Sequence, residues 1–177
     1  MITRITQSME TTPELLESHP LDPFLRGDRM PHIWCSGCGI GVVMGALIRA
    51  IDHLGLKNDD VALVAGIGCT ARMPVYMDFN TLHTTHGRAL AFATGLKIAR
   101  PDMKVITIMG DGDALAIGGN HFIHAARRNL GITALVVNNA IYGMTGGQYS
   151  PTTPLGGKAT TAPYGNVEPP FPVCELA

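Results

Sequence analysis

The chain has 177 residues, enough for one domain with a full hydrophobic core. With 13 basic and 14 acidic residues its net charge is −1, and this balance argues against binding to nucleic acid or to an anionic membrane. Residues 1–7 lack the apolar stretch of a signal peptide, and no run approaches the ~20 apolar residues of a membrane helix. We therefore expect a soluble, cytoplasmic protein.

Residues 1–33 are polar and interrupted by prolines, with short helical character around Pro13 to Glu17. We expect them to form an N-terminal arm that lies over the domain or on a partner. Residues 34–177 are expected to form the main domain. Because residues 172–177 read like the first turn of a helix without a terminator, we expect this domain to be truncated at its C-terminal end.

Helices and apolar strands alternate from residue 38 onward. The spacing of apolar residues predicts helices at about 38–54, 88–99 and 119–129, and buried strands at 61–65, 105–109 and 133–138. Because the strands are almost wholly apolar, this order predicts an α/β fold in which helices cover both faces of a parallel sheet. Residues 143–170 are rich in Gly, Pro and Thr and predict a long loop with a functional role.

For two of these helices, the spacing of the apolar residues also predicts which face is buried. On the first helix the predicted face consists of Val43, Leu47, Ile51 and Leu54. On the second it consists of Ala89, Phe92, Ala93 and Leu96. Gly55 and Pro101 are placed to end these helices.

Two residues whose side chains carry oxygen atoms directly follow predicted strands. Asp111 lies in Gly-Asp-Gly-Asp (110–113) after strand 105–109, and Asn139 follows strand 133–138. The 25 residues between Gly112 and Asn138 suffice for a right-handed crossover, which brings both groups to the sheet edge where ligands bind. A carboxylate and an amide oxygen there suit Mg²⁺ carrying a diphosphate. The alternative is that both sequences are ordinary turns.

Three cysteines are predicted near the same edge. Cys35 and Cys38 form a Cys-x-x-Cys pattern, and Cys69 follows strand 61–65. Three thiolates near a cofactor suit an iron–sulfur cluster, which commonly uses four cysteines, and zinc accepts the same ligands. A thioredoxin-like pair is less favoured, since no strand is predicted before Trp34. The alternative for Cys69 is a small buried apolar residue.

Three further side chains near these loops allow more than one role. His86 precedes a helix start, where an imidazole and a helix N-terminus favour a diphosphate, so we predict that it contacts the cofactor, with capping or packing as the alternative. Arg88 is expected to pair either with a phosphate or with a neighbouring acid. Asp113 is expected to form hydrogen bonds at the cofactor loop or to cap the following helix.

Five segments in order carry a family resemblance: Trp-Cys-Ser-Gly-Cys-Gly (34–39), Gly-Ile-Gly-Cys (66–69), His-Thr-Thr-His-Gly-Arg-Ala (83–89), Gly-Asp-Gly-Asp with the residues after it (110–121) and Asn-Asn-Ala-Ile-Tyr-Gly-Met-Thr-Gly-Gly-Gln (138–148). The set resembles the β subunits of 2-oxoacid:ferredoxin oxidoreductases, which use thiamine diphosphate. Residues 142–148, followed by Ser-Pro-Thr-Thr (150–153), are most similar to the 2-oxoglutarate branch.

The resemblance implies that residues 34–177 are a thiamine diphosphate-binding domain of the diphosphate-module fold. It implies that Mg²⁺ is held by the side chains of Asp111 and Asn139 and by the Ile141 carbonyl. The other cofactor residues are expected to be Ile67, Gly68, Cys69, His86, Gly110, Gly112, Asp113, Tyr142, Gly143, Met144 and Thr145.

The resemblance also implies that Cys35, Cys38 and Cys69 bind one [4Fe–4S] cluster. The family's fourth cluster cysteine lies beyond residue 177. Cys174 lies too early to match it and is expected to be an ordinary buried thiol.

The activity that the resemblance implies is oxidative decarboxylation of a 2-oxo acid, 2-oxoglutarate in the nearest branch, with coenzyme A, giving succinyl-CoA, CO₂ and reduced ferredoxin. The sequence identifies no glutamate to activate the cofactor, so we expect it from an α subunit that carries the pyrimidine module. One alternative is a non-oxidative thiamine diphosphate-dependent decarboxylase or synthase. Another is a non-catalytic, zinc-stabilised assembly subunit.

Overall fold

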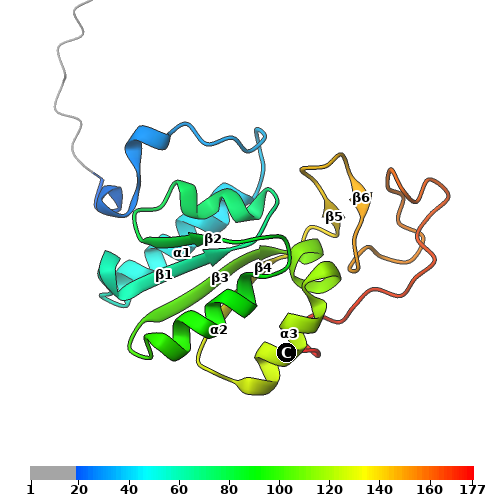
Figure 1. Cartoon of the computed structure of the whole chain (residues 1–177). Helices are drawn as coiled ribbons and strands as arrows, with labels where there is room; N and C mark the ends of the chain where they lie inside the picture. Colours follow the sequence, from blue (N-terminus) through cyan, green and yellow to red (C-terminus); the bar gives the residue numbers. More distant parts are fainter. Residues whose placement is uncertain (1–18) are drawn as a thin grey trace, which may run out of the picture.

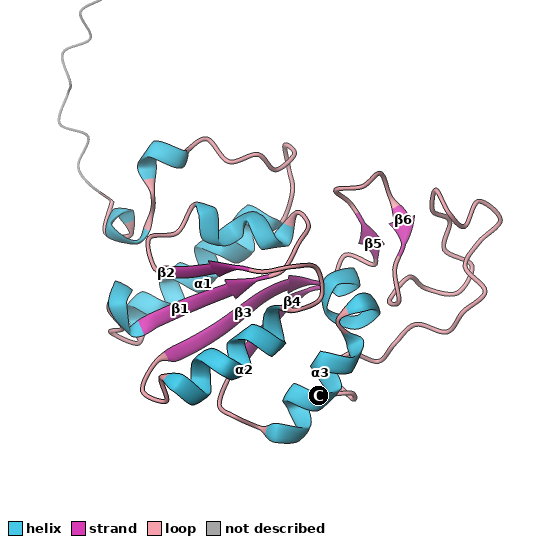
Figure 2. Ribbon diagram, viewed as in Figure 1, coloured by secondary structure: helices cyan, strands magenta, loops and turns pink. Residues whose placement is uncertain are grey.

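A parallel sheet with helices on both faces forms the centre of the computed structural model, which describes residues 19–177 (Figure 1). The strands β1 (Val61–Ala65), β2 (Asn80–His83), β3 (Lys104–Gly110) and β4 (Thr133–Val137) lie in the order β2-β1-β3-β4. Helix α1 (Ile40–His53) covers one face, and α2 (Ala89–Ala99) and α3 (Gly119–Arg128) lie on the other (Figure 2). The predicted fold class is confirmed.

Strand β1 shows why its sequence is apolar throughout. Leu63 packs into the cluster that contains the buried side chains of α1, whereas Val64 packs into the cluster formed with α2 and α3. Every residue of β1 is buried, because successive side chains point to opposite faces and each face is covered.

Both predicted helix faces need correction. Helix α1 buries Ile40, Met44, Ile48 and Ile51, whereas the predicted Leu54 is 69% exposed. Two neighbouring stripes of α1 are apolar, so spacing alone could not choose between them. On α2 the predicted Phe92 is 49% exposed. Ala89 and Ala93 are buried as predicted, and these small residues let the helix lie close to the sheet.

Several short elements were not predicted. The edge strand β2 was missed because all four of its side chains are exposed and show no apolar alternation. The predicted loop 143–170 contains β6 (Gln148–Tyr149), which pairs with β5 (Ile141–Tyr142). The remaining short helices are η1 (Asp22–Phe24), η2 (Gly27–Arg29), η3 (Asn58–Asp60), η4 (Thr70–Val75) and the π-helix η5 (Gly112–Ile117).

The part of the predicted N-terminal arm that is described lies on the domain. Phe24 is buried and stacks on Phe79 with 5.7 Å between ring centroids, and the Asp78 amide donates to the Phe24 carbonyl at 2.8 Å. The helical character predicted around Pro13 to Glu17 falls outside the described residues. The arm's boundary at residue 33 stays a prediction.

The end of the chain also differs from expectation. Residues 172–176 form a single turn in which the Leu176 amide donates to the Pro172 carbonyl at 3.1 Å. Val173 and Leu176 pack against the cluster between the sheet and α2, which turns Cys174 outward. Cys174 is therefore exposed, and its prediction as a buried thiol was wrong. Within residues 19–177, no helix has both the length and the apolar character to span a membrane.

Candidate active site

The loops that follow β1, β3 and β4 meet at one end of the sheet, next to the β5–β6 pair (Figure 1). They enclose a cavity of about 100 Å³. Thr70 lines this cavity and was not predicted. All of the predicted cofactor residues also line it: Ile67, Gly68, Cys69, His86, Gly110, Asp111, Gly112, Asp113, Asn139, Ile141, Tyr142, Gly143, Met144 and Thr145. The topology thus gathers segments that are far apart in the sequence.

The predicted metal ligands lie in contact with one another. A terminal atom of the Asn139 carboxamide is 2.9 Å from Asp111 Oδ1 and 2.8 Å from the Ile141 carbonyl oxygen. When the amide nitrogen takes this position, it donates to both oxygens. When the amide oxygen takes it, three oxygens face one another, and a cation is needed to balance them.

These separations fit a magnesium ion. Neighbouring ligands of an octahedral Mg²⁺ with bonds of about 2.0–2.1 Å lie about 2.9 Å apart. The carboxylate, amide and carbonyl oxygens of Asp111, Asn139 and Ile141 are also the hard ligands that this ion prefers. The arrangement therefore suits an octahedral site in which Asn139 is a neighbour of both Asp111 and Ile141, with the other positions left for phosphate and water.

Asp113 links the cavity to two other loops. Its Oδ1 lies 2.5 Å from His86 Nδ1 and accepts from the Gly87 amide at 2.7 Å. The hydrogen bonds expected at the loop are present, and within residues 19–177 no side chain caps the start of the following helix α3. Asp113 Oδ2 is buried, has no hydrogen-bond partner among residues 19–177 and faces Gly66, where a Cβ would lie 2.0 Å away.

Within residues 19–177 Arg88 makes no ion pair with an acid, and its pairing with a phosphate stays a prediction. Its guanidinium donates to the Ile117 carbonyl at 3.0 Å. It therefore ties the start of α2 to the end of η5, and its pairing with a neighbouring acid was wrong. His86, in contrast, has a side chain that is 37% exposed, so its ring can reach a ligand in the cavity.

Tyr142 forms one wall of the cavity. Its hydroxyl donates to the Gly112 carbonyl at 3.2 Å, and a Cβ on Gly112 would lie 2.2 Å from its ring. Burial, and then the negative charges of Asp111 and Asp113, raise the pKa of Tyr142 above the usual 10.0. At about pH 10, where an exposed tyrosine is half ionised, we expect this phenol to remain mostly protonated.

A difference titration measures this directly. The ultraviolet absorbance of the protein minus that of Tyr142→Phe should report tyrosinate formation with a midpoint above pH 10, because the phenolate is disfavoured by both causes. A midpoint at or below the ordinary value would contradict the environment described for Tyr142.

The three predicted cluster cysteines approach one another without closing a metal site. Burial first, and then Cys38 and Cys35, raise the pKa of Cys69, so the three thiols lie within electrostatic range. The indole Nε1 of Trp34 donates to the Cys69 carbonyl at 2.8 Å and holds the two loops together. No group of three His, Cys, Asp or Glu side chains in the described residues is arranged to hold a metal ion.

Two site residues were missed. Ser150 and Thr152 are buried, and their hydroxyls contact Asp111 Oδ2. They lie in the Ser-Pro-Thr-Thr segment that contributed to the family resemblance, but nothing in the sequence indicated a partner 39 or 41 residues away.

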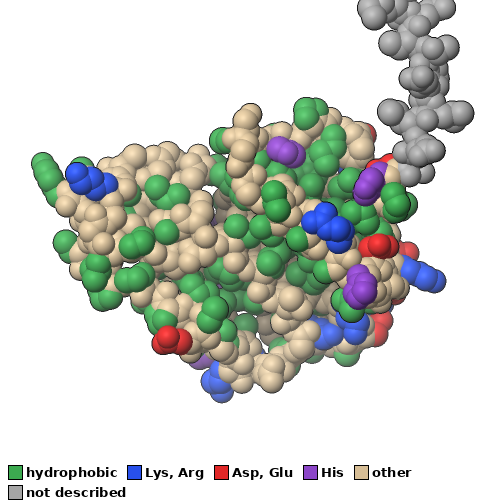
Figure 3. Space-filling view, turned by 180° about the vertical axis from the view of Figure 1, so that it is seen from behind, with side chains coloured by type: hydrophobic (Ala, Val, Ile, Leu, Met, Phe, Trp, Pro, Cys, Tyr) green, Lys and Arg blue, Asp and Glu red, His purple; other side chains and the backbone are tan. Residues whose placement is uncertain are grey.

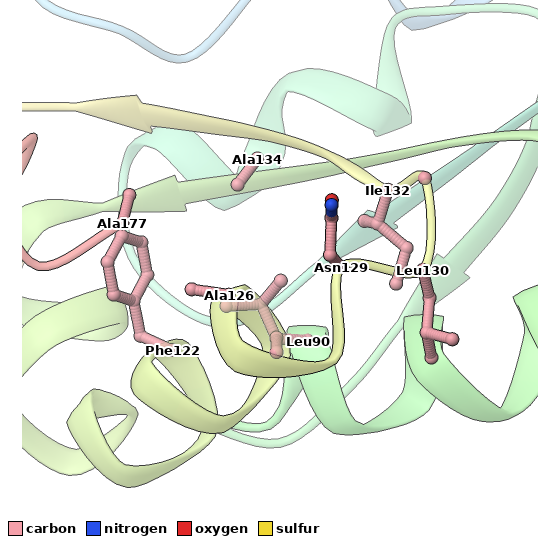
Figure 4. A pocket seen from close by; sticks show the side chains of 10 residues that line it. Leu90, Phe122, Ala126, Asn129, Leu130, Ile132, Ala134 and Ala177 are labelled. Atoms are coloured by element: carbon pink, nitrogen blue, oxygen red, sulfur yellow. The ribbon is translucent and has the colours of Figure 1, made fainter.

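A second cavity, of about 210 Å³, lies between α3 and the start of β4 (Figure 4). Phe122, Leu130 and Ile132 line it with other mainly apolar residues, and Ala177 lies at its edge. It has no titratable side chain and shares no residue with the first cavity. Of these two cavities the first, although smaller, is therefore the one equipped for chemistry.

Known proteins resemble this chain closely. The family model "Thiamine pyrophosphate enzyme, C-terminal TPP binding domain" matches residues 66–177. The chain is 58% identical over 159 residues to the 2-oxoglutarate synthase subunit KorB of Methanocaldococcus jannaschii, covering 90% of this chain and 59% of that protein. It is 47% identical over 144 residues to the 2-oxoglutarate oxidoreductase subunit KorB of Mycobacterium tuberculosis, covering 81% of this chain and 39% of that protein.

A solved structure agrees with these relatives. The 2-oxoglutarate:ferredoxin oxidoreductase from Magnetococcus marinus, with 2-oxoglutarate, coenzyme A and succinyl-CoA bound, matches with a TM-score of 0.84 and 41% identity. The match covers 92% of this chain and 56% of that one. The chain thus spans between 39% and 59% of the length of these three proteins. The family resemblance inferred from the motifs is confirmed.

Proposed function

The chain belongs to the thiamine pyrophosphate enzymes and, within them, to the β subunits of the 2-oxoacid:ferredoxin oxidoreductases, and from this membership we propose that it forms the diphosphate-binding half of an active site for oxidative decarboxylation. The proposed reaction converts 2-oxoglutarate and coenzyme A to succinyl-CoA and CO₂, while two electrons pass to ferredoxin. Bound thiamine diphosphate supplies the nucleophile and the electron sink for decarboxylation.

One observation carries the proposal: the contact between Asp111, Asn139 and the Ile141 carbonyl at the carboxyl ends of β3 and β4. In this role the three oxygens hold Mg²⁺, and the ion holds the diphosphate. The other residues of the cavity orient the cofactor, with Tyr142 as a wall and His86 fixed by Asp113. The remaining assignments of cofactor residues are proposals of the same kind.

A partner subunit is part of the proposal. The cavity is smaller than the ~300–1,000 Å³ of sites that enclose a whole ligand, and none of its lining residues is a glutamate. An α subunit with the pyrimidine module would enclose the rest of the cofactor and supply the activating glutamate. Hydrophobic side chains are exposed at several places on the face seen in Figure 3. Large exposed apolar residues of the domain include Ile33, which is 63% exposed, and Val42, which is 72% exposed, and such side chains are available for contacts with a partner.

We propose that electrons leave through a [4Fe–4S] cluster for which Cys35, Cys38 and Cys69 supply three of the ligands. The proximity of these thiols and the position of Cys69 on the wall of the cofactor cavity support this role. The raised pKa of Cys69 favours its thiol form. Metal binding would displace this proton, because cysteine binds metals as the thiolate. The division at residue 33 and a cytoplasmic location remain predictions.

Metal analysis of the full-length protein, purified anaerobically with its partner subunit, tests this function. We expect iron with the broad visible absorption of a cluster, and reduction of ferredoxin that requires both 2-oxoglutarate and coenzyme A. Cys69→Ser should lose the iron. Cys174→Ser should keep it, because Cys174 is exposed and its neighbours Val173 and Leu176 pack into a different core cluster from Cys38 and Cys69.

The alternatives give different results. Zinc without iron, and no turnover, would favour the assembly subunit. Release of CO₂ without ferredoxin reduction, from a protein that lacks iron, would favour a non-oxidative decarboxylase or synthase.

A further inference from the structure

The two carboxylate oxygens of Asp111 have different surroundings. Oδ1 faces Asn139 and the proposed magnesium position. Oδ2 faces the opposite way, into a buried pocket of hydroxyl groups, where it accepts from Ser150 Oγ and from Thr152 Oγ1, the latter at 2.7 Å. Asp111 and Ser150 are 1% and 2% exposed, so water does not compete for these bonds.

The turn that carries the hydroxyls is itself fixed. The Ser150 amide donates to Thr153 Oγ1 at 2.8 Å, and the Thr153 amide donates back to the Ser150 carbonyl at 3.0 Å. Thr153 Oγ1 also donates to the Ala140 carbonyl at 2.7 Å, next to Ile141. The turn is thus attached to the loop after β4 and presents its hydroxyls in a fixed direction.

Thr152 joins the loops that follow two strands. Its Oγ1 lies 2.8 Å from Asn138 Oδ1 as well as 2.7 Å from Asp111 Oδ2, and these two acceptors share its single hydroxyl proton. The loop after β3 and the loop after β4 are therefore held at one separation by a side chain that itself makes no contact with the metal position.

We propose that Ser150 and Thr152 are positioning residues that engage Oδ2 of Asp111 and so restrict this carboxylate to binding Mg²⁺ through Oδ1 alone. This role rests on the proposed magnesium site, and it gives a reason why that site would bind Mg²⁺ in preference to Ca²⁺. Mg²⁺ requires a near-ideal octahedron, whereas Ca²⁺ accepts carboxylates through both oxygens in a larger and more flexible shell. Occupying Oδ2 with two hydroxyl donors therefore disfavours Ca²⁺ at this position.

The test measures binding of Mg²⁺ and of Ca²⁺, each with thiamine diphosphate, to the assembled complex by calorimetry. Ser150→Ala and Thr152→Val should each weaken Mg²⁺-dependent binding about ten- to hundredfold, the usual effect of removing an outer-shell partner. Ca²⁺-dependent binding should weaken less, so that the ratio of the Mg²⁺-dependent affinity to the Ca²⁺-dependent affinity decreases. Thr152→Ser keeps the hydroxyl and should restore both affinity and preference.

Thr107→Val is the matched control, because it makes the same hydroxyl-to-methyl change at a buried threonine of β3 whose Oγ1 has no partner in the described structure. It should leave both affinities unchanged. If Ser150→Ala prevents assembly, Thr152→Val and Thr152→Ser still give the comparison.

Three results would overturn the inference: an unchanged Mg²⁺ affinity in Thr152→Val, an equal loss in Thr152→Ser, or equal losses for the two ions. These outcomes leave the proposed function intact as long as Asp111→Asn abolishes Mg²⁺-dependent binding. If Asp111→Asn binds normally, the magnesium site itself is wrong.

Discussion

Asp111→Asn should cost the assembled protein more than about a hundredfold of its Mg²⁺-dependent affinity for thiamine diphosphate. Changes to outer-shell partners of metal ligands already cost about 10–100-fold, and this substitution removes the charge of a direct ligand. Because asparagine keeps an oxygen that can accept from Ser150 and Thr152, the buried hydroxyls retain a partner and the fold should persist. Calorimetric titration at saturating Mg²⁺ measures the effect.

The replacement chosen at position 111 decides whether the experiment measures binding alone or binding together with stability. Asp111→Ala would leave both hydroxyls without their acceptor and would add an unfolding cost of about 1–3 kcal/mol to the loss of binding. Asp102→Asn is the control, since this carboxylate is exposed and pairs with Arg100 at the surface. Cofactor affinity that survives in Asp111→Asn would contradict the role of Asp111.

Gly87→Ala should lower the free energy of unfolding by about 2–5 kcal/mol. Gly87 has φ +72°, where a side chain costs about 1–2 kcal/mol. A Cβ there would also lie 2.6 Å from the backbone nitrogen of Gly118, and such overpacking costs about 1–3 kcal/mol more. Because the Gly87 amide donates to Asp113, the substitution should also disturb the position of His86.

Gly55→Ala separates the two causes. Gly55 has φ +65° but no atom within 4 Å of the position of a Cβ, so its substitution carries the conformational cost alone. In urea or thermal unfolding, Gly87→Ala should therefore be clearly less stable than Gly55→Ala. Equal stabilities would show that the loop at Gly87 does not pack against η5 as described.

The sequence predicted which residues the structure gathers around the first cavity, because most of them follow strands. Asp111 and Asn139 come directly after apolar runs, and parallel strands bring such positions to one edge. The cavity residues after β1, such as Cys69, were found by the same logic. Position along the chain was sufficient where a regular element fixed the direction of the loop.

The missed features depend on tertiary contacts that have no local pattern. Ser150 and Thr152 reach Asp111 from a turn in a Gly- and Pro-rich segment, and any of several hydroxyls there was an equal candidate. Strand β2 lies at the edge of the sheet with exposed side chains, so it has no apolar signal. Phe92 has the right spacing for the core, but the close approach of α2 through Ala89 and Ala93 turns it outward.

Diffraction at the manganese absorption edge, from crystals of the complete complex grown with Mn²⁺ and thiamine diphosphate, tests the magnesium site most directly. We expect one anomalous peak about 2.0–2.3 Å from Asp111 Oδ1, the Asn139 amide oxygen and the Ile141 carbonyl oxygen, with the diphosphate on the open side of the ion. A cofactor-bound ion that touches neither Asp111 nor Asn139 would contradict it.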